Sequence, residues 1–286
     1  MSAEETLPAA SPDSSNDWGT ESIDPDAYLR RIGYDGPRDA TRETFLALHR
    51  AHRGTIAFEN IDVVLERGVS LDMTDLQRKL VTAGRGGYCY EHNLLFAGVL
   101  ERFGFRVSRQ LARVRRGTRQ LRYRAHAALV VTVGNEPWLA DVGFGDEGLI
   151  EPIPLFPGSI AKAGDWTWRV VREADQWLLQ SLHPDDWFDL YSFRDERHFA
   201  VDFEATNYYT THSTRSTFVG KLIVMRGTEN VRYLLRERQF VTSYPDGRTE
   251  RVEKTDAQAV QVLRDVFDIR LTPEEASLLR QHLAAS

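Results

Sequence analysis

The sequence predicts an α+β fold built in three successive parts, and three observations support this prediction. Up to Phe105 the chain carries helix-capping residues and apolar side chains at helical spacing. After Phe105 it changes to short strand-like runs separated by Gly, Asn and Asp. It ends on further strand-like runs followed by two helices. We therefore expect a helical first third, a central antiparallel sheet or barrel, and a mixed α/β end.

The expected helices of the first third have local start or stop signals. Asp24 and Pro25 supply an N-cap and a proline at the first helical position. Thr74 is expected to cap the third helix, and Gly84 to end it. The expected ranges are Asp26–Ile32, Thr41–Arg53, Asp75–Ala83 and Cys89–Gly104.

The expected strands fall into two sets. The central set comprises Val107–Val114, Ala125–Val133, Trp138–Val142, Trp166–Arg172 and Gln176–Leu182. The later set comprises Thr217–Arg226, Glu229–Glu237 and Gln239–Tyr244, with a turn at Pro245-Asp246-Gly247. Two helices, Asp256–Phe267 and Pro273–Ala284, are expected to close the chain.

Composition and charge narrow the class of protein. The apolar fraction of 42% and charged fraction of 27% over 286 residues are those of a globular protein. A net charge of −6 argues against a general nucleic-acid binder or a binder of anionic membranes. No apolar run approaches the roughly 20 residues that a membrane-spanning helix needs. We therefore expect a protein that binds neither nucleic acid nor membrane.

The N-terminal segment and the cysteine content suggest where the protein works. Residues 1–23 are acidic and rich in Ser and Pro, without a basic start or an apolar core, so we expect a disordered extension and no secretory signal. The single cysteine, Cys89, allows no intramolecular disulfide and no cysteine-built metal site. We therefore expect a cytoplasmic protein without a metal.

Cys89 stands at the start of a predicted helix, directly after a glycine-rich run. The partial positive charge of a helix N-terminus favours a thiolate there. The backbone N–H groups of the first turn are candidate donors to an oxyanion. These features indicate a nucleophile. The alternative is an inert, buried cysteine that packs as a small apolar side chain.

A predicted hairpin supplies candidate partners for this thiol. Gly134-Asn135 is a two-residue turn signal between two strand-like runs. If Val133 pairs with Glu136, His126 and Asp141 become diagonal neighbours on one face of the hairpin. Asp141 can then orient the imidazole, and the other ring nitrogen can act as a base toward Cys89. A register slip of one residue would separate them, leaving a strand histidine and a turn aspartate without chemistry.

At these residues the chain resembles the arylamine N-acetyltransferases, particularly the bacterial type. The segment Arg85–Asn93 reads RGGYCYEHN and is similar to the family's Arg-Gly-Gly-x-Cys-x-Glu-x-Asn signature. Upstream, Phe58-Glu59-Asn60 is similar to its Phe-Glu-Asn segment. Downstream, His126 and Asp141-Val142-Gly143-Phe144-Gly145 resemble its histidine strand and Asp-x-Gly-Phe-Gly stretch. The likeness spans roughly residues 24–286.

The resemblance implies a three-part fold with a cysteine-protease-like Cys-His-Asp core. A helical bundle (24–105) would carry Cys89, a β-barrel (106–205) would carry His126 and Asp141, and an α/β lid (206–286) would follow. It also implies a ping-pong reaction in which acetyl-CoA acetylates Cys89 and an arylamine, arylhydrazine or arylhydroxylamine takes the acetyl group. Such an enzyme would serve xenobiotic metabolism.

The resemblance also assigns the neighbouring positions. Phe58 and Phe144 would line the acceptor pocket, and Gly143 and Phe144 would lie near the pantetheine arm of coenzyme A. Glu59 and Arg85 would form a structural ion pair beside the cysteine. The segment 211–218 lacks a proline that family members often carry, although Arg215 and Thr217 could still bind the phosphates of coenzyme A.

Three other functions fit the same catalytic residues or the same fold. One is an amide synthase that closes a macrolactam on an aromatic amine. Another is a Cys-His-Asp hydrolase or transglutaminase-like enzyme, and the third is a catalytically silent ligand-binding protein. The expected partners are coenzyme A and a small aromatic amine, and the sequence is also compatible with a homo-oligomer.

Overall fold

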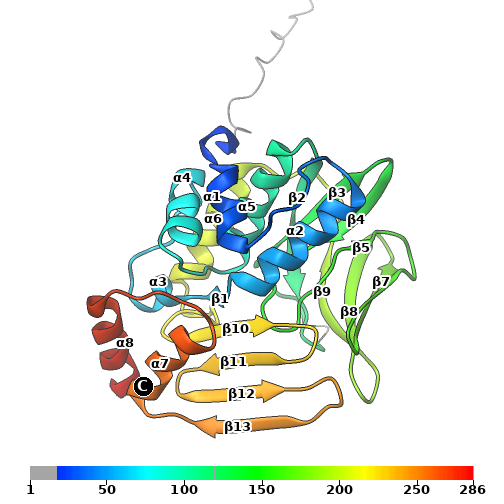
Figure 1. The fold of residues 1–286 in the computed structure, drawn as a ribbon. Helices are drawn as coiled ribbons and strands as arrows, with labels where there is room; N and C mark the ends of the chain where they lie inside the picture. The colour runs from blue at the N-terminus through cyan, green and yellow to red at the C-terminus, as the bar shows by residue number, and fades with distance from the viewer. Residues whose placement is uncertain (1–17, 119, 286) are drawn as a thin grey trace, which may run out of the picture.

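Helices, an eight-stranded sheet and a five-stranded sheet make up the fold of the computed structural model, which describes residues 18–118 and 120–285 (Figure 1). The chain passes through these parts largely in order. One exception is strand β1 (Phe58–Glu59), which leaves the helical part and pairs with β10 (Ile223–Gly227) of the five-stranded sheet. The predicted α+β fold class in three parts is confirmed.

The helical part begins before the first predicted helix. Its elements are η2 (Thr20–Ser22), α1 (Pro25–Ile32), α2 (Arg42–Thr55), α3 (Ile61–Val64), α4 (Met73–Leu76), η3 (Gln77–Thr82) and α5 (Cys89–Arg102). The Asp24 side chain accepts a hydrogen bond from the amide of Ala27, and Gly33 ends α1 in the left-handed conformation. Helix α5 is buried along its first twelve residues, Cys89 to Leu100, so it forms the centre of this part.

Two expectations for the helical part need correction. The expectation that residues 1–23 are disordered was wrong for residues 18–23, because Ile23 is buried and the Trp18 ring packs edge-on against Phe203. Residues 1–17 lie outside the described residues. Thr74 does not cap the third helix. The Asp72 carboxylate accepts from the Thr74 amide at 2.8 Å, so α4 starts earlier and then widens into the π-helical turn η3.

The eight-stranded sheet curls until its two edge strands lie next to each other, which makes a nearly closed barrel. Its order is β5 (Ile153–Pro154), β4 (Glu136–Ala140), β3 (His126–Val133), β2 (Arg106–Val114), β9 (Trp187–Phe193), β8 (Gln176–Leu182), β7 (Trp166–Glu173) and β6 (Ile160–Ala163). Val133 pairs with Glu136 as the turn signal predicted. The ladder ends at Ala140, so Asp141 lies just beyond β4.

Helix α6 (Ala200–His212), which the sequence did not reveal, follows the barrel in the chain but packs back on the helical part, where Phe203 joins its core and Asn207 contacts Tyr88. The five-stranded sheet has the order β1-β10-β11-β12-β13, with β11 (Arg232–Arg236), β12 (Gln239–Ser243) and β13 (Thr249–Glu253). Helices α7 (Asp256–Asp265) and α8 (Pro273–Ala285) lie beside this sheet (Figure 1). Their buried side chains share a hydrophobic core with it.

The strand expected at Thr217–Arg226 is shorter than predicted. Residues 213–220 form turns in which the Ser213 and Ser216 hydroxyls accept from the amides of Arg215 and Phe218. These local hydrogen bonds compete with strand pairing. Thr217 therefore lies in a loop before β10, and not on a strand.

Candidate active site

Cys89 is the first residue of α5, and glycines let the surrounding backbone approach it closely. The Glu91 carboxylate accepts from the Tyr88 amide at 3.0 Å, which closes one side of a capping arrangement at the helix start. A Cβ atom on Gly86 would lie 2.1 Å from the carbonyl oxygen of Ala57. A Cβ atom on Gly143 would lie 2.8 Å from the Cα of Cys89. Both close approaches require glycine, so the backbone itself fixes the position of Cys89.

His126 and Asp141 meet as the hairpin register requires. The imidazole Nε2 lies 2.7 Å from the Asp141 Oδ2, and both side chains are buried. Burial alone would lower the pKa of His126, but the charge of Asp141 and hydrogen bonds to Asp141 and Cys89 raise this pKa to about 10. Burial alone would raise the pKa of Asp141. The charge of His126 and the hydrogen bonds donated by His126, Asn93 and the Gly143 amide keep this pKa below its ordinary value.

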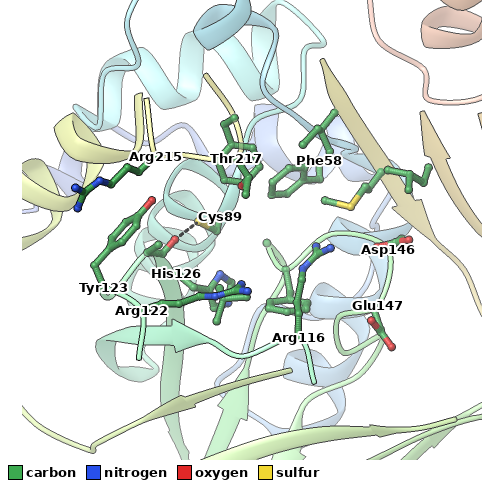
Figure 2. Close-up of a pocket in the computed structure, with 18 of the residues that line it drawn as sticks. Phe58, Cys89, Arg116, Arg122, Tyr123, His126, Asp146, Glu147, Arg215 and Thr217 are labelled. Atoms are coloured by element: carbon green, nitrogen blue, oxygen red, sulfur yellow. Dashed lines mark hydrogen bonds between the residues drawn. The ribbon is translucent and has the colours of Figure 1, made fainter. Parts of the chain in front are cut away.

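The imidazole faces both the carboxylate and the thiol. Since Nε2 is engaged by Asp141, Nδ1 is the nitrogen left for Cys89. Cys89 and His126 line the same cavity, and the thiol also lies 3.6 Å from the carbonyl oxygen of Ala125 (Figure 2). The raised pKa of His126 favours its charged form at neutral pH. The arrangement therefore suits a thiolate–imidazolium pair.

Asn93 contacts the aspartate from the helix that carries the cysteine. Its side-chain amide donates to Asp141 Oδ1 at 3.0 Å and to the Ala127 carbonyl at 2.7 Å, and its Oδ1 accepts from Val142 N at 3.1 Å. Sequence reasoning gave Asn93 no role. Asn93 stands four residues after Cys89 on the same face of the helix, and this spacing could have placed it near the catalytic residues.

Aromatic rings surround the imidazole. The Phe144 ring meets it edge to face at 5.0 Å between centroids, and the Tyr191 ring of β9 lies at 4.7 Å. Tyr191 was not anticipated, because β9 was not predicted. These rings exclude water from the His126–Asp141 hydrogen bond and thereby strengthen it.

A cavity of about 900 Å³ opens beside these groups. It is lined by all of the predicted pocket residues, namely Phe58, Gly143, Phe144 and Thr217, together with Cys89 and His126. Figure 2 shows Arg215 and Thr217 of the last part across the cavity from His126. Arg116, Arg122 and Tyr123 also line it, and these residues were missed. They follow β2 in a loop whose path the sequence pattern does not reveal.

Glu59 and Arg85 form an ion pair within a larger buried network. The Arg85 guanidinium donates to Glu59 at 2.8 Å and to Glu275 of α8 at 2.6 Å. Lys79 bridges Asp62 and Glu91 at 2.6 and 2.7 Å. This network anchors the loop before Cys89 to both β1 and the C-terminal helix. It stabilises the position of the cysteine and does not touch the cavity.

The remaining histidine of the motif points away from the cavity. The His92 Nδ1 lies 2.9 Å from Nε2 of His52 on α2, whose Nδ1 lies 2.7 Å from the Tyr28 hydroxyl.

Within residues 18–118 and 120–285, no group of three or more His, Cys, Asp or Glu side chains is arranged to hold a metal ion. Over the same residues, no helix is long and apolar enough to cross a membrane.

Comparison with known proteins gives consistent matches over most of the chain. A family model described as N-acetyltransferase matches residues 41–276. The arylamine N-acetyltransferase of Escherichia coli is 35% identical over 221 residues, which cover 77% of this chain and 79% of that protein. That of Mycolicibacterium smegmatis is 35% identical over 257 residues, covering 87% and 93%.

Solved structures agree with these matches. The Nocardia farcinica arylamine N-acetyltransferase superposes with a TM-score of 0.90 at 36% identity, covering 96% of this chain and all of that one (100%). The Mycobacterium marinum arylamine N-acetyltransferase in complex with CoA has a TM-score of 0.82 at 33% identity, covering 92% and 97%.

Proposed function

Since the chain belongs to the arylamine N-acetyltransferase family, we propose that it transfers the acetyl group of acetyl-CoA to arylamines, arylhydrazines or arylhydroxylamines through a thioester on Cys89. The observation that carries this proposal is the cavity that Cys89 and His126 share, with Asp141 hydrogen-bonded behind the histidine. The proposed catalytic residues are Cys89 as nucleophile, His126 as proton carrier and Asp141 as the group that orients it.

The first half-reaction acetylates the enzyme. The Cys89 thiolate attacks the carbonyl carbon of acetyl-CoA, and N–H groups at the start of α5 stabilise the oxyanion because they lack intrahelical acceptors. The carbon–sulfur bond to coenzyme A then breaks. The leaving thiolate takes the proton of the His126 imidazolium, so coenzyme A departs as a thiol and His126 becomes neutral.

The second half-reaction uses the neutral imidazole. An arylamine is weakly basic and reaches the thioester uncharged. Its nitrogen attacks the acetyl carbon while His126 takes one N–H proton. The bond to the Cys89 sulfur breaks, the amide leaves, and the thiolate–imidazolium pair is restored. The enzyme thus returns to its starting protonation state.

The cavity suggests where each substrate lies. Phe58 and Phe144 offer aromatic faces to the acceptor ring, while Gly143, Phe144 and Thr217 line the route proposed for the pantetheine arm and phosphates. Each proposed part of the chain contributes: the bundle (24–105) supplies Cys89, the barrel (106–205) supplies His126 and Asp141, and the lid (206–286) supplies Thr217. A reactive thiol favours a reducing compartment, so we place the enzyme in the cytoplasm.

Mass spectrometry after mixing with acetyl-CoA alone tests the proposal. We expect one acetyl group on Cys89, which persists until aniline is added and then appears as acetanilide. The Cys89→Ala variant should take up no acetyl group. Rapid loss of the acetyl group to water without amine would indicate a hydrolase instead, and failure of simple anilines to accept it would point to the amide synthase alternative.

A further inference from the structure

Helix α2 contacts the loop that follows β4 through two buried polar side chains. This loop, residues 141–150, is called the aspartate loop below because it begins with Asp141; it also carries Gly143 and Phe144. His49 and Arg53 stand four residues apart on α2, one helical turn, and are 0% and 2% exposed. Both side chains bind backbone atoms of the aspartate loop.

His49 contacts both ends of the loop. Its Nε2 accepts a hydrogen bond from the Asp141 amide at 3.2 Å, and its Nδ1 lies 3.0 Å from the Ile150 carbonyl oxygen. Because an amide donates and a carbonyl accepts, these contacts require a neutral ring protonated at Nδ1. Burial lowers the pKa of His49 to about 4, which keeps the ring in this form at neutral pH.

Arg53 holds the middle of the loop. Its Nη2 donates to the Gly145 carbonyl at 2.5 Å, and its Nε donates to the Leu149 carbonyl at 3.3 Å. Gly145 follows Phe144, whose ring touches His126 and lines the cavity. A planar guanidinium fixes two acceptors at a set separation, which a single ammonium cannot do.

We propose that His49 and Arg53 are positioning residues for the transfer reaction, with His49 fixing the ends of the aspartate loop, including Asp141, and Arg53 fixing its middle, next to Phe144. This inference rests on the proposed function. His49 sets the backbone from which the Asp141 carboxylate reaches His126. Arg53 sets the position of the ring proposed to contact the acceptor. His49 therefore acts on the activation of Cys89 through His126, and Arg53 acts on the binding of the acceptor.

Alkylation of Cys89 by iodoacetamide tests the role of His49 without acetyl-CoA or amine. The variant His49→Met keeps volume but leaves the buried Asp141 amide without an acceptor, which costs roughly 1–3 kcal/mol. We expect alkylation at neutral pH to slow by about 10-fold, the equivalent of about 1.4 kcal/mol. The apparent pKa of His126 in the pH–rate profile should fall. His49→Gln can supply both an acceptor and a donor, so its alkylation rate should stay within about threefold of wild type.

His52→Met is the matched control. His52 lies on the same helix, is equally buried, and bonds to Tyr28 and His92 instead of the aspartate loop. It should lower the melting temperature without changing the pH–rate profile of alkylation. Equal effects of His49→Met and His52→Met, or no rescue by His49→Gln, would overturn the role of His49.

Steady-state kinetics test Arg53. Arg53→Met should raise the KM for aniline by about 10-fold while alkylation stays within about threefold, because only the middle of the loop, next to Phe144, is released. Arg53→Lys can still donate to one of the two carbonyls and should give an intermediate KM, and it serves if Arg53→Met does not fold. A parallel fall in alkylation, or an unchanged KM, would overturn this half. If the His49 variants alkylate as predicted but the wild-type protein acetylates no arylamine, the proposed function is refuted and the positioning role of His49 stands.

Discussion

The Asn93 side-chain amide lies 3.0 Å from Oδ1 of Asp141, so the helix that presents Cys89 also orients the carboxylate behind His126. The nucleophile and the aspartate come from different parts of the fold. Asn93 joins them with one side chain that also binds the backbone at Ala127 and Val142. The side chain of Asn93 therefore links the helix of Cys89 directly to the carboxylate that orients His126.

Replacing Asn93 by Ala should slow alkylation of Cys89 by about 10- to 100-fold, because Asp141 loses a donor and two buried backbone groups lose partners worth roughly 1–3 kcal/mol each. The control is Asn60→Ala. Asn60 is another buried asparagine that binds the backbone at Phe218, Lys221 and Ile223. This variant should lose comparable stability in urea denaturation and retain the alkylation rate. Similar alkylation rates in the two variants would contradict the proposed role of Asn93.

Replacing Asp141 by Asn should lower the pKa of His126 from about 10 toward its ordinary range, because the charge of Asp141 is the main influence that raises it against burial. At neutral pH a smaller fraction of the enzyme would then hold the thiolate–imidazolium pair. The prediction is checked by following the His126 ring with NMR over a pH titration. A pKa that stays near 10 in the variant would show that another group supports the imidazolium.

The unfolding free energy should depend on pH through His126. Its pKa is about 10 when folded and about 6.5 when unfolded, so the folded state binds more protons between these values. The stabilisation is fully present below pH 6.5 and is lost as pH rises through 10. Its size is on the order of 5 kcal/mol, because the two pKa values differ by about 3.5 and each pH unit corresponds to about 1.4 kcal/mol. Urea denaturation of Cys89→Ala from pH 6 to 10, where no thiol can give up a proton in exchange, should show this loss, and the Cys89→Ala, Asp141→Asn double variant should show much less of it.

The sequence revealed the parts of the site that depend on local signals. The glycines before Cys89 set the start of its helix. The Gly134-Asn135 turn sets the pairing of Val133 with Glu136. Each of these features follows from the backbone conformation of a few neighbouring residues. The fold class followed from the same kind of local pattern.

Elements that depend on distant partners were missed. Strand β9 contains Asp189, a residue disfavoured in strands, whose carboxylate accepts hydrogen bonds from Gln180 of β8 and from Arg115, which follows β2. Helix α6 buries only Phe203, Asn207 and Thr210, so it carries no continuous apolar stripe. Tyr191 and the cavity-lining Arg116 could not be placed because they follow from these long-range pairings.

Replacing Gly143 by Ala should abolish acylation of Cys89 and destabilise the fold. The added Cβ would lie 2.8 Å from both the Cys89 Cα and the Asn93 Nδ2, where neither the helix backbone nor the hydrogen-bonded amide can give way. Overpacking of this kind costs roughly 1–3 kcal/mol. The control is Gly54→Ala, since Gly54 lies on α2 with nothing within 4 Å of an added Cβ. That variant should be neutral or more stable by up to about 1 kcal/mol. Burst kinetics with p-nitrophenyl acetate and thermal melts compare the two, and a burst retained by Gly143→Ala would show that the aspartate loop can retreat from Cys89 without loss of function.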